Sequence, residues 1–235
     1  MWTVPYAVDN DLFARRSCEA SVHRTELQRE LQLDPTRPIL LFASKLQPRK
    51  RVLDLLDAYL ALTPNREPHP YLLIVGDGED RPTLEVRIAH AAAQDIRSIR
   101  LCGFRNQSEL PRFFDLATVF VLPSRHEPWG LIVNEAMASA TPVILSDEVG
   151  CHPDLLTDGI EGYLFPAGNI PALTHALRKI LEDPQRAAQM GQNALARIRP
   201  WSIEADIRAL RLAIFCIAHK HVLPDRPATR GAVTS

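Results

Sequence analysis

Short, wholly apolar runs recur along this chain, and each is followed by a polar or glycine-bearing turn and then by a helical pattern. The clearest runs are Ile39–Ala43, Tyr71–Val75 and residues 117–122. Runs of this length without polar interruption are typical of strands that are buried on both faces, as in parallel sheets. Strands that alternate with helices favour right-handed β-α-β units. We therefore predict an α/β fold built on a parallel sheet.

The remaining segments complete this pattern with shorter elements. We expect two further strands, at residues 99–101 and 142–145, and helices at residues 21–33, 52–62, 82–93, 108–116, 131–139, 171–181, 184–198 and 202–219. Residues 1–20 are expected to be irregular because Pro5, Asp9, Asn10 and Asp11 favour turns. Residues 220–235 are expected to form a disordered tail.

Size, charge and cysteine usage exclude several classes of protein. A chain of 235 residues suits one α/β domain with extensions, and its net charge of −1 does not favour nucleic acid or anionic lipid. The four cysteines are widely spaced, which disfavours a disulfide framework or a zinc site. We expect no signal peptide, no transmembrane segment and a cytoplasmic location, with peripheral membrane association left open.

Four candidate motifs, at residues 44–50, 76–78, 103–106 and 124–135, each come directly after a predicted strand. Because ligands in parallel α/β sheets bind beyond the carboxyl ends of the strands, we expect these motifs to converge on one edge. The first holds Lys45 and Lys50, whose ammonium groups could neutralise a diphosphate. A solvated basic loop is the alternative interpretation.

The two glycine-bearing motifs are less specific. Gly76 permits a tight turn and a close approach of the backbone to a ligand, but Asp-Gly is also an ordinary turn. Gly103 and Phe104 could shape a pocket for a base, or they could simply end a strand.

The stretch HEPWGLIVNEAMA at residues 126–138 is the most informative motif, because Glu127 and Glu135 are separated by seven residues around Gly130. A glycine at the start of a helix leaves the amides of residues 130–133 as donors for an anion. The two carboxylates could then accept hydrogen bonds from the hydroxyls of a sugar and a ribose. The alternative is two charges placed favourably near a helix start. His126 and Trp129 are interpreted as structural residues.

With these residues in place, the chain resembles the family-4 retaining glycosyltransferases of the GT-B type over about residues 2–219. ASKLQPRKRVLDLLDAY, YLLIVGDGED, IRLCGF and DLLTDGIEGYLFPAGN each resemble a family segment, and LPSRHEPWGLIVNEAMASATPVILSD resembles its E-x7-E block. The resemblance implies a Rossmann-like fold that corresponds to the C-terminal half of a GT-B enzyme, and it implies a hexosyltransferase that uses a nucleoside-diphosphate sugar.

The resemblance also assigns roles to residues. Lys45, Lys50 and Glu127 are implied to be catalytic, the lysines at the diphosphate and Glu127 at the transferred sugar. No metal or other cofactor is implied. The implied donor-binding residues are Ser44, Gly76, Gly103, Phe104, Gly130, Leu131, Ile132, Val133 and Glu135.

The chain departs from the family pattern at four positions. Lys45 replaces the usual Arg, and Ser44, Arg51 and Ala140 replace glycines. Lys45 keeps the charge but loses the bidentate fork of arginine.

The resemblance further predicts an organisation in which the acceptor-binding N-terminal domain is missing. Residues 1–20 would be an interdomain linker remnant, 21–199 the nucleotide-sugar domain, and 200–219 a helix that crosses back to the other domain. The expected partners are a nucleotide-sugar donor, an unknown sugar or lipid-linked acceptor, and a separately encoded N-terminal half. Two alternatives remain: a non-catalytic fragment or subunit, and an unrelated α/β nucleotide-binding protein.

Overall fold

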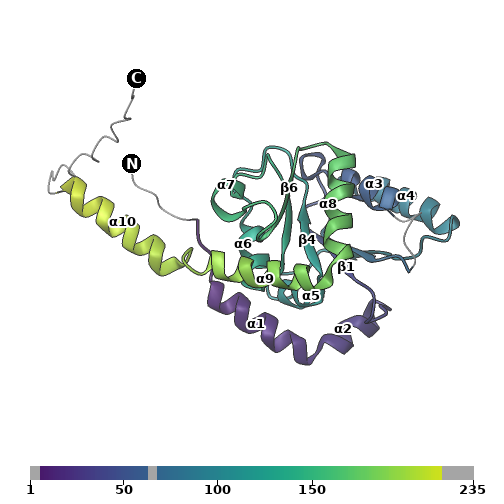
Figure 1. The fold of residues 1–235 in the computed structure, drawn as a ribbon, viewed down its shortest axis with the longest axis horizontal. Coiled ribbons are helices and arrows are strands. Elements are labelled where there is room, and N and C mark those ends of the chain that lie inside the picture. Colours follow the sequence, from purple (N-terminus) through teal and green to yellow (C-terminus); the bar gives the residue numbers. More distant parts are fainter. Residues whose placement is uncertain (1–5, 63–67, 219–235) are drawn as a thin grey trace, which may run out of the picture.

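The computed structural model describes residues 6–62 and 68–218, which form a six-stranded parallel sheet covered by helices (Figure 1). The strand order is β3-β2-β1-β4-β5-β6. The strands are β1 (Ile39–Ala43), β2 (Tyr71–Val75), β3 (Ile99–Gly103), β4 (Val119–Leu122), β5 (Val143–Ser146) and β6 (Gly162–Phe165). The predicted α/β fold with a Rossmann-like parallel sheet is confirmed.

The apolar runs are buried because they lie in the centre of the sheet. Every residue of β1, β2, β4 and β5 is buried, as expected for strands covered on both faces. Strand β1 pairs with β2 in a register that runs from Ile39 opposite Tyr71 to Ala43 opposite Val75. On its other side, β1 pairs with β4 through Leu40 and Val119.

The helices pack in groups around this sheet. Helix α3 packs against α8, while α1 packs against α5 and α6, and α6 packs against α9. The helices are α1 (Asn10–Val22), α2 (Arg24–Glu30), α3 (Val52–Leu62), α4 (Arg81–Ala93), α5 (Leu110–Leu116), α6 (Leu131–Ala138), α7 (His152–Leu155), α8 (Ile170–Glu182), α9 (Pro184–Ile198) and α10 (Ile203–Ala218), with a 3-10 turn η1 (Pro48–Lys50).

The expectation that residues 1–20 are irregular is wrong, because α1 occupies Asn10–Val22. The Asp9 carboxylate accepts a hydrogen bond of 2.8 Å from the Leu12 amide and so caps the helix. Phe13 is buried, and the Ser17 hydroxyl bonds the Ser139 hydroxyl at 2.8 Å. Helix α1 is therefore part of the folded domain, and the expected helix over 21–33 is the shorter α2.

Besides α1 and the 3-10 turn η1, the short helix α7 and the edge strand β6 were not predicted. A Cβ atom on Gly162, at the start of β6, would lie 1.7 Å from the Val143 carbonyl oxygen. The glycine therefore lets β6 approach β5 closely enough to pair with it.

The strand order reverses direction between β1 and β4, which lie side by side. The chain leaves β1 towards β2 on one side, and it leaves β4 towards β5 on the other. Such a switch point opens a crevice at the carboxyl ends of the strands. The loops after β1 and β4 carry residues 44–50 and 124–130, so the fold places these two motifs beside the crevice.

Helix α10 extends away from the sheet at one end of the molecule (Figure 1). Its side chains Ile203, Ile207, Leu210, Ile214 and Ile217 are exposed by 43 to 72%. They recur at intervals of four and three residues and so form one apolar stripe. Within the described residues, no helix is long and apolar enough to cross a membrane. The predicted disordered tail lies outside the described residues.

Candidate functional site

Backbone hydrogen bonds join three loops at the carboxyl edge of the sheet. The Arg125 amide, after β4, donates to the Arg49 carbonyl, after β1, at 2.7 Å. The Glu127 amide donates to the Glu148 carbonyl at 3.0 Å, and the Gly150 amide returns a bond of 2.8 Å to the Glu127 carbonyl. The motifs at residues 44–50 and 124–135 therefore lie together, as predicted. The loop after β5, which was not predicted to take part, joins them at Glu127.

Lys50 and Glu127 form an ion pair at this point. The Lys50 ammonium contacts the Glu127 Oε2 atom, and the Arg49 guanidinium reaches the same oxygen at 3.3 Å. The side chains of Lys50 and Glu127 are only 9% and 10% exposed. Because burial strengthens such interactions, Lys50 and Arg49 together place positive charge around one largely buried carboxylate.

The turn after Glu127 depends on close backbone packing. A Cβ atom on Gly150 would lie 2.0 Å from the Pro128 carbonyl oxygen, so only glycine fits there. Gly130 adopts a left-handed conformation with φ of 90°, immediately before α6. These two glycines let the chain turn sharply from the Glu127 loop into the helix.

The start of α6 provides fewer free amides than predicted. The Val133 amide donates to the Gly130 carbonyl at 2.8 Å, so the expectation of an open donor at Val133 is wrong. The tight first turn of the helix causes this bond. The Leu131 and Ile132 amides have no acceptor among the described residues. The Gly130 amide also has no acceptor among the described residues, so these three amides remain the candidates for holding an anion.

Glu135 lies one helical turn further along α6 and is separated from the Lys50–Glu127 pair. Its side chain is buried, and Oε1 accepts a hydrogen bond of 2.8 Å from the Gln107 Nε2 atom. Burial raises the pKa of the Glu135 carboxyl, and the bond from Gln107 partly opposes that rise. Gln107 was not identified from the sequence, although it belongs to the polar segment that follows the Gly103–Phe104 motif.

A mainly apolar cavity of about 270 Å³ lies between the loops after β1, β2 and β3. Several predicted site residues line it: the catalytic candidate Lys45 and the donor-binding candidates Ser44, Gly76, Phe104 and Ile132. Ala43, Val75, Asp77, Arg105 and Leu110 complete the wall. The Phe104 residue is 71% exposed, so its ring is accessible to a flat ligand.

Glycine shapes this cavity at Gly76. A Cβ atom there would lie 1.9 Å from the Ser44 carbonyl oxygen, and the residue has a φ of 139°. The Gly76 amide donates to the Gly103 carbonyl at 2.8 Å, which links the loops after β2 and β3. Gly76 and Gly103, two of the glycines predicted at the site, are therefore joined by a backbone hydrogen bond.

The two lysines serve different parts of the crevice. Lys45 is exposed and lines the apolar cavity, whereas Lys50 is buried against Glu127. The sequence predicted that both lysines face a diphosphate. In the structure, Lys50 is ion-paired with Glu127, whereas Lys45 lines the cavity.

Trp129 packs as a structural residue, as predicted. Its ring lies 5.1 Å from the Tyr6 ring and 5.4 Å from the Trp201 ring, measured between centroids. Its indole nitrogen donates to Asn134 Oδ1 at 3.1 Å, and the Asn134 amide donates to the Tyr6 carbonyl at 2.9 Å. These contacts anchor the first described residues and the segment before α10 to the turn that holds the site.

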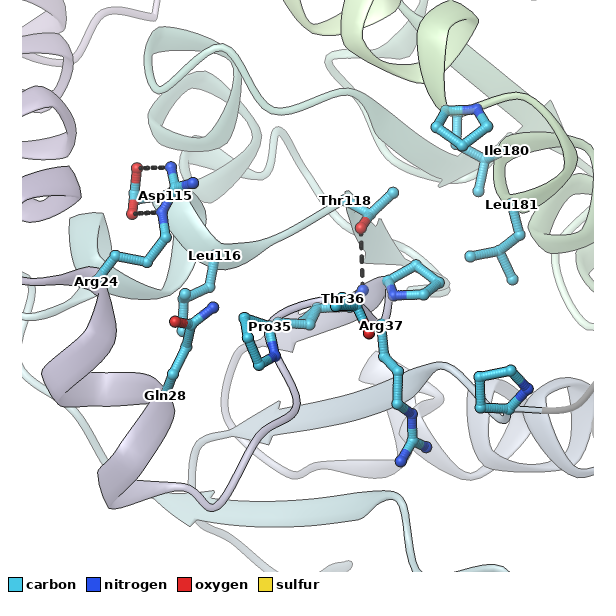
Figure 2. A pocket seen from close by; sticks show the side chains of 14 residues that line it. Arg24, Gln28, Pro35, Thr36, Arg37, Asp115, Leu116, Thr118, Ile180 and Leu181 are labelled. Atoms are coloured by element: carbon cyan, nitrogen blue, oxygen red, sulfur yellow. Dashed lines mark hydrogen bonds and ion pairs between the residues drawn. The ribbon is translucent and has the colours of Figure 1, made fainter.

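A larger cavity of about 700 Å³ lies at the opposite, amino edge of the sheet (Figure 2). Its charged residues already have protein partners. Figure 2 shows the Arg24 guanidinium facing Asp115, which it bonds at 2.7 and 2.8 Å. The Arg37 guanidinium bonds the His69 carbonyl and stacks 4.0 Å from the centre of the Tyr71 ring. At the carboxyl edge, by contrast, Lys45 lines a cavity and has no ion-pair partner among the described residues, so this edge is the candidate functional site.

Known proteins resemble this chain in sequence and in fold. Alpha-D-kanosaminyltransferase of Streptomyces kanamyceticus is 30% identical over 179 residues, which cover 76% of this chain and 45% of that protein. The structure of sucrose-phosphate synthase from Thermosynechococcus elongatus matches 92% of this chain and 52% of its own, with a TM-score of 0.71 and 26% identity. Anabaena HepE in complex with UDP matches 92% of this chain and 57% of its own, with a TM-score of 0.73 and 20% identity.

The chain spans about half the length of the curated relatives it matches. The family model for glycosyl transferases group 1 matches residues 23–197, which include every candidate site residue named above. This chain belongs to the group 1 glycosyl transferases.

Proposed function

We propose that this chain binds the nucleoside-diphosphate sugar of a retaining hexosyltransferase. The Lys50–Glu127 pair at the switch point carries the proposal, because it places a cation and a hydroxyl-binding carboxylate within one crevice. The nearby start of α6 adds the Leu131 and Ile132 amides, which suit a phosphate. The Anabaena relative was solved with UDP, which supports a uridine nucleotide as the first ligand to test.

Each part of the crevice has a proposed role. The base and ribose occupy the cavity beside Phe104, with Glu135 accepting the ribose hydroxyls. The diphosphate lies between the lysines and the start of α6, so that positive charge stabilises the leaving group as the glycosidic bond breaks. Glu127 accepts hydroxyls of the transferred sugar, and no metal is needed in this scheme.

Isothermal titration with UDP, GDP and their sugars tests donor binding directly. We expect binding that weakens by about tenfold or more in Lys50→Ala, the size of a lost charged hydrogen bond. Lys179→Ala is the matched control, because Lys179 lies on α8 against the Tyr163 ring. No binding at millimolar ligand, or equal affinities in the two variants, would contradict the proposal.

The acceptor side of the reaction is proposed to come from a second domain, because the relatives are about twice as long as this chain. The apolar stripe of α10 offers a surface on which such a domain could pack. We therefore expect the chain alone to transfer sugar poorly to any sugar or lipid-linked acceptor. Rapid turnover of donor and acceptor by the purified chain would contradict this expectation.

The same stripe favours a second candidate function, in which the chain is a non-catalytic subunit that binds nucleotide sugar. Ile207→Lys and Ile214→Lys place charge in the stripe without touching the crevice. If a partner covers the stripe, both variants lose co-purification with that partner but keep UDP affinity. A monodisperse monomer with no partner in either the parent or the variant chain would count against this candidate.

A further inference from the structure

The Glu135 carboxylate is buried in α6 and receives its side-chain hydrogen bond from a different part of the chain. Gln107, on the loop between β3 and α5, donates its amide hydrogen to Glu135 Oε1 at 2.8 Å. Gln107 is 28 positions away in sequence and is itself an exposed residue. A buried carboxylate without a hydrogen-bond donor is energetically costly. The bond from Gln107 therefore stabilises the ionised form of Glu135 and fixes the orientation of its carboxylate.

The pair lies at the border of the apolar cavity. Arg105 and Leu110, which flank Gln107 in sequence, both line the cavity, and so does Ile132, which lies three residues before Glu135 on α6. Residues three apart on a helix share a face, so Glu135 neighbours the cavity wall formed by Ile132. A ring bound in the cavity would therefore have its attached hydroxyls close to Glu135.

We propose that Gln107 is a positioning residue that holds Glu135 ionised and correctly oriented, with Oε2 directed to a ligand hydroxyl. This inference rests on the proposed function, because it names a residue that supports the donor-binding role of Glu135. A carboxylate has several acceptor sites, so one oxygen can be fixed by Gln107 while the other receives a ligand. Gln107 itself need not touch the ligand.

Charged side chains on neighbouring elements do not replace Gln107 in this role. In the described part of the chain, burial and the Gln107 bond are the two influences on the pKa of Glu135. Several charged groups on neighbouring elements are held by other partners: Asp115 by Arg24, Arg105 by Glu30 and Glu109, Arg197 by the Asp154 carbonyl, and Arg15 by Glu19.

The test compares UDP affinity between about pH 5 and pH 9 in the parent chain and in Gln107→Leu. At neutral pH we expect the variant to lose affinity by about tenfold, since a bond to a charged group is missing. The part of this loss that comes from protonation of Glu135 should shrink as the pH rises, so the loss should depend on pH. Gln107→Glu should lose more, because a second carboxylate faces Glu135.

A control and a ligand-free measurement make the result decisive. Gln94→Leu removes another exposed glutamine, at the end of α4, and should leave the affinity unchanged.

The carboxyl carbon of Glu135 can be titrated by NMR without ligand, and its midpoint should move to higher pH in Gln107→Leu. Failure of the parent chain to bind UDP would overturn the proposed function alone, because this titration needs no ligand. An unchanged titration midpoint, or an affinity loss that is equal at every pH, would overturn the role of Gln107.

Discussion

Lys50 and Glu127 are 77 positions apart in sequence, yet their side chains form an ion pair with 9% and 10% of their surfaces exposed. Removing one partner of a buried pair leaves an uncompensated charge. We therefore expect Lys50→Ala to lower the free energy of unfolding by about 3 kcal/mol. Arg49→Ala should cost less than about 1 kcal/mol, because Arg49 is 48% exposed. Urea denaturation of both variants measures this, and equal losses would contradict the assignment of Lys50 as the main partner.

Ala140 adopts a left-handed conformation with φ of 56°, at a position where the resembled family commonly has glycine. A side chain costs about 1 to 2 kcal/mol in this region, so Ala140→Gly should stabilise the protein by about 1 kcal/mol. Ala89→Gly, at an exposed position in α4, should instead destabilise it by a similar amount. Thermal melts of the two variants should therefore shift in opposite directions.

Burial of Glu135 gives the protein a pH-dependent stability. Because burial raises its pKa above the ordinary 4.5, the folded state holds more protons than the unfolded state between these two values. Stability from this group therefore falls as pH rises through that window. Glu135→Gln keeps the acceptor for Gln107 and removes the charge, so unfolding should become harder by up to about 1 kcal/mol at pH 8.

The gain from Glu135→Gln should disappear below pH 4.5, where the carboxyl of the parent chain is protonated in both states. UDP binding should weaken in the same variant, since an amide is a poorer acceptor than a carboxylate. A variant that is less stable than the parent at pH 8 would contradict this prediction, because it would mean that hydrogen bonds offset the cost of burying the Glu135 charge.

The cysteines should differ widely in reactivity. Burial raises the pKa of the Cys102 thiol to about 11 and that of the Cys151 thiol to about 12, whereas Cys18 is exposed. Since the thiolate is the reactive form, Cys102 and Cys151 should resist an aromatic disulfide reagent at pH 8 until denaturant is added. Cys18 should react rapidly, and Cys18→Ser should remove one thiol from the fast phase. Fast labelling of Cys151 would contradict its burial.

The sequence predicted the centre of the sheet well, because its strands carry uninterrupted apolar runs. Strands β1 and β2 have the predicted bounds, since both are enclosed by polar or proline-bearing segments. Helix α1 was missed because Asp9 and Asn10 are favoured both in turns and at helix starts, and only the Asp9–Leu12 bond distinguishes these uses. Strand β6 was missed because it begins at Gly162, a residue more typical of turns, and because its pairing depends on contact with Val143.

The sequence indicated which residues form the site, but it did not indicate which of them contact one another. The motif spacing indicated Glu127, Glu135 and Lys50, whereas their direct partners depend on tertiary contacts that no local pattern encodes. Gln107 belongs to a polar loop whose composition resembles any other surface turn. The open amide expected at Val133 is instead used within the helix, because the first turn of α6 is tight.

The adjacency of β1 and β4 has a consequence for folding. Residues 50 and 127 become neighbours only when β4 pairs with β1, although β2, β3 and their helices lie between these two strands in sequence. Contacts so distant in sequence form late, because loop closure is costly until the sheet supports it. Ligand affinity in the crevice is therefore a measure of complete sheet assembly, and a chain that is only partly folded should retain helices while binding no ligand.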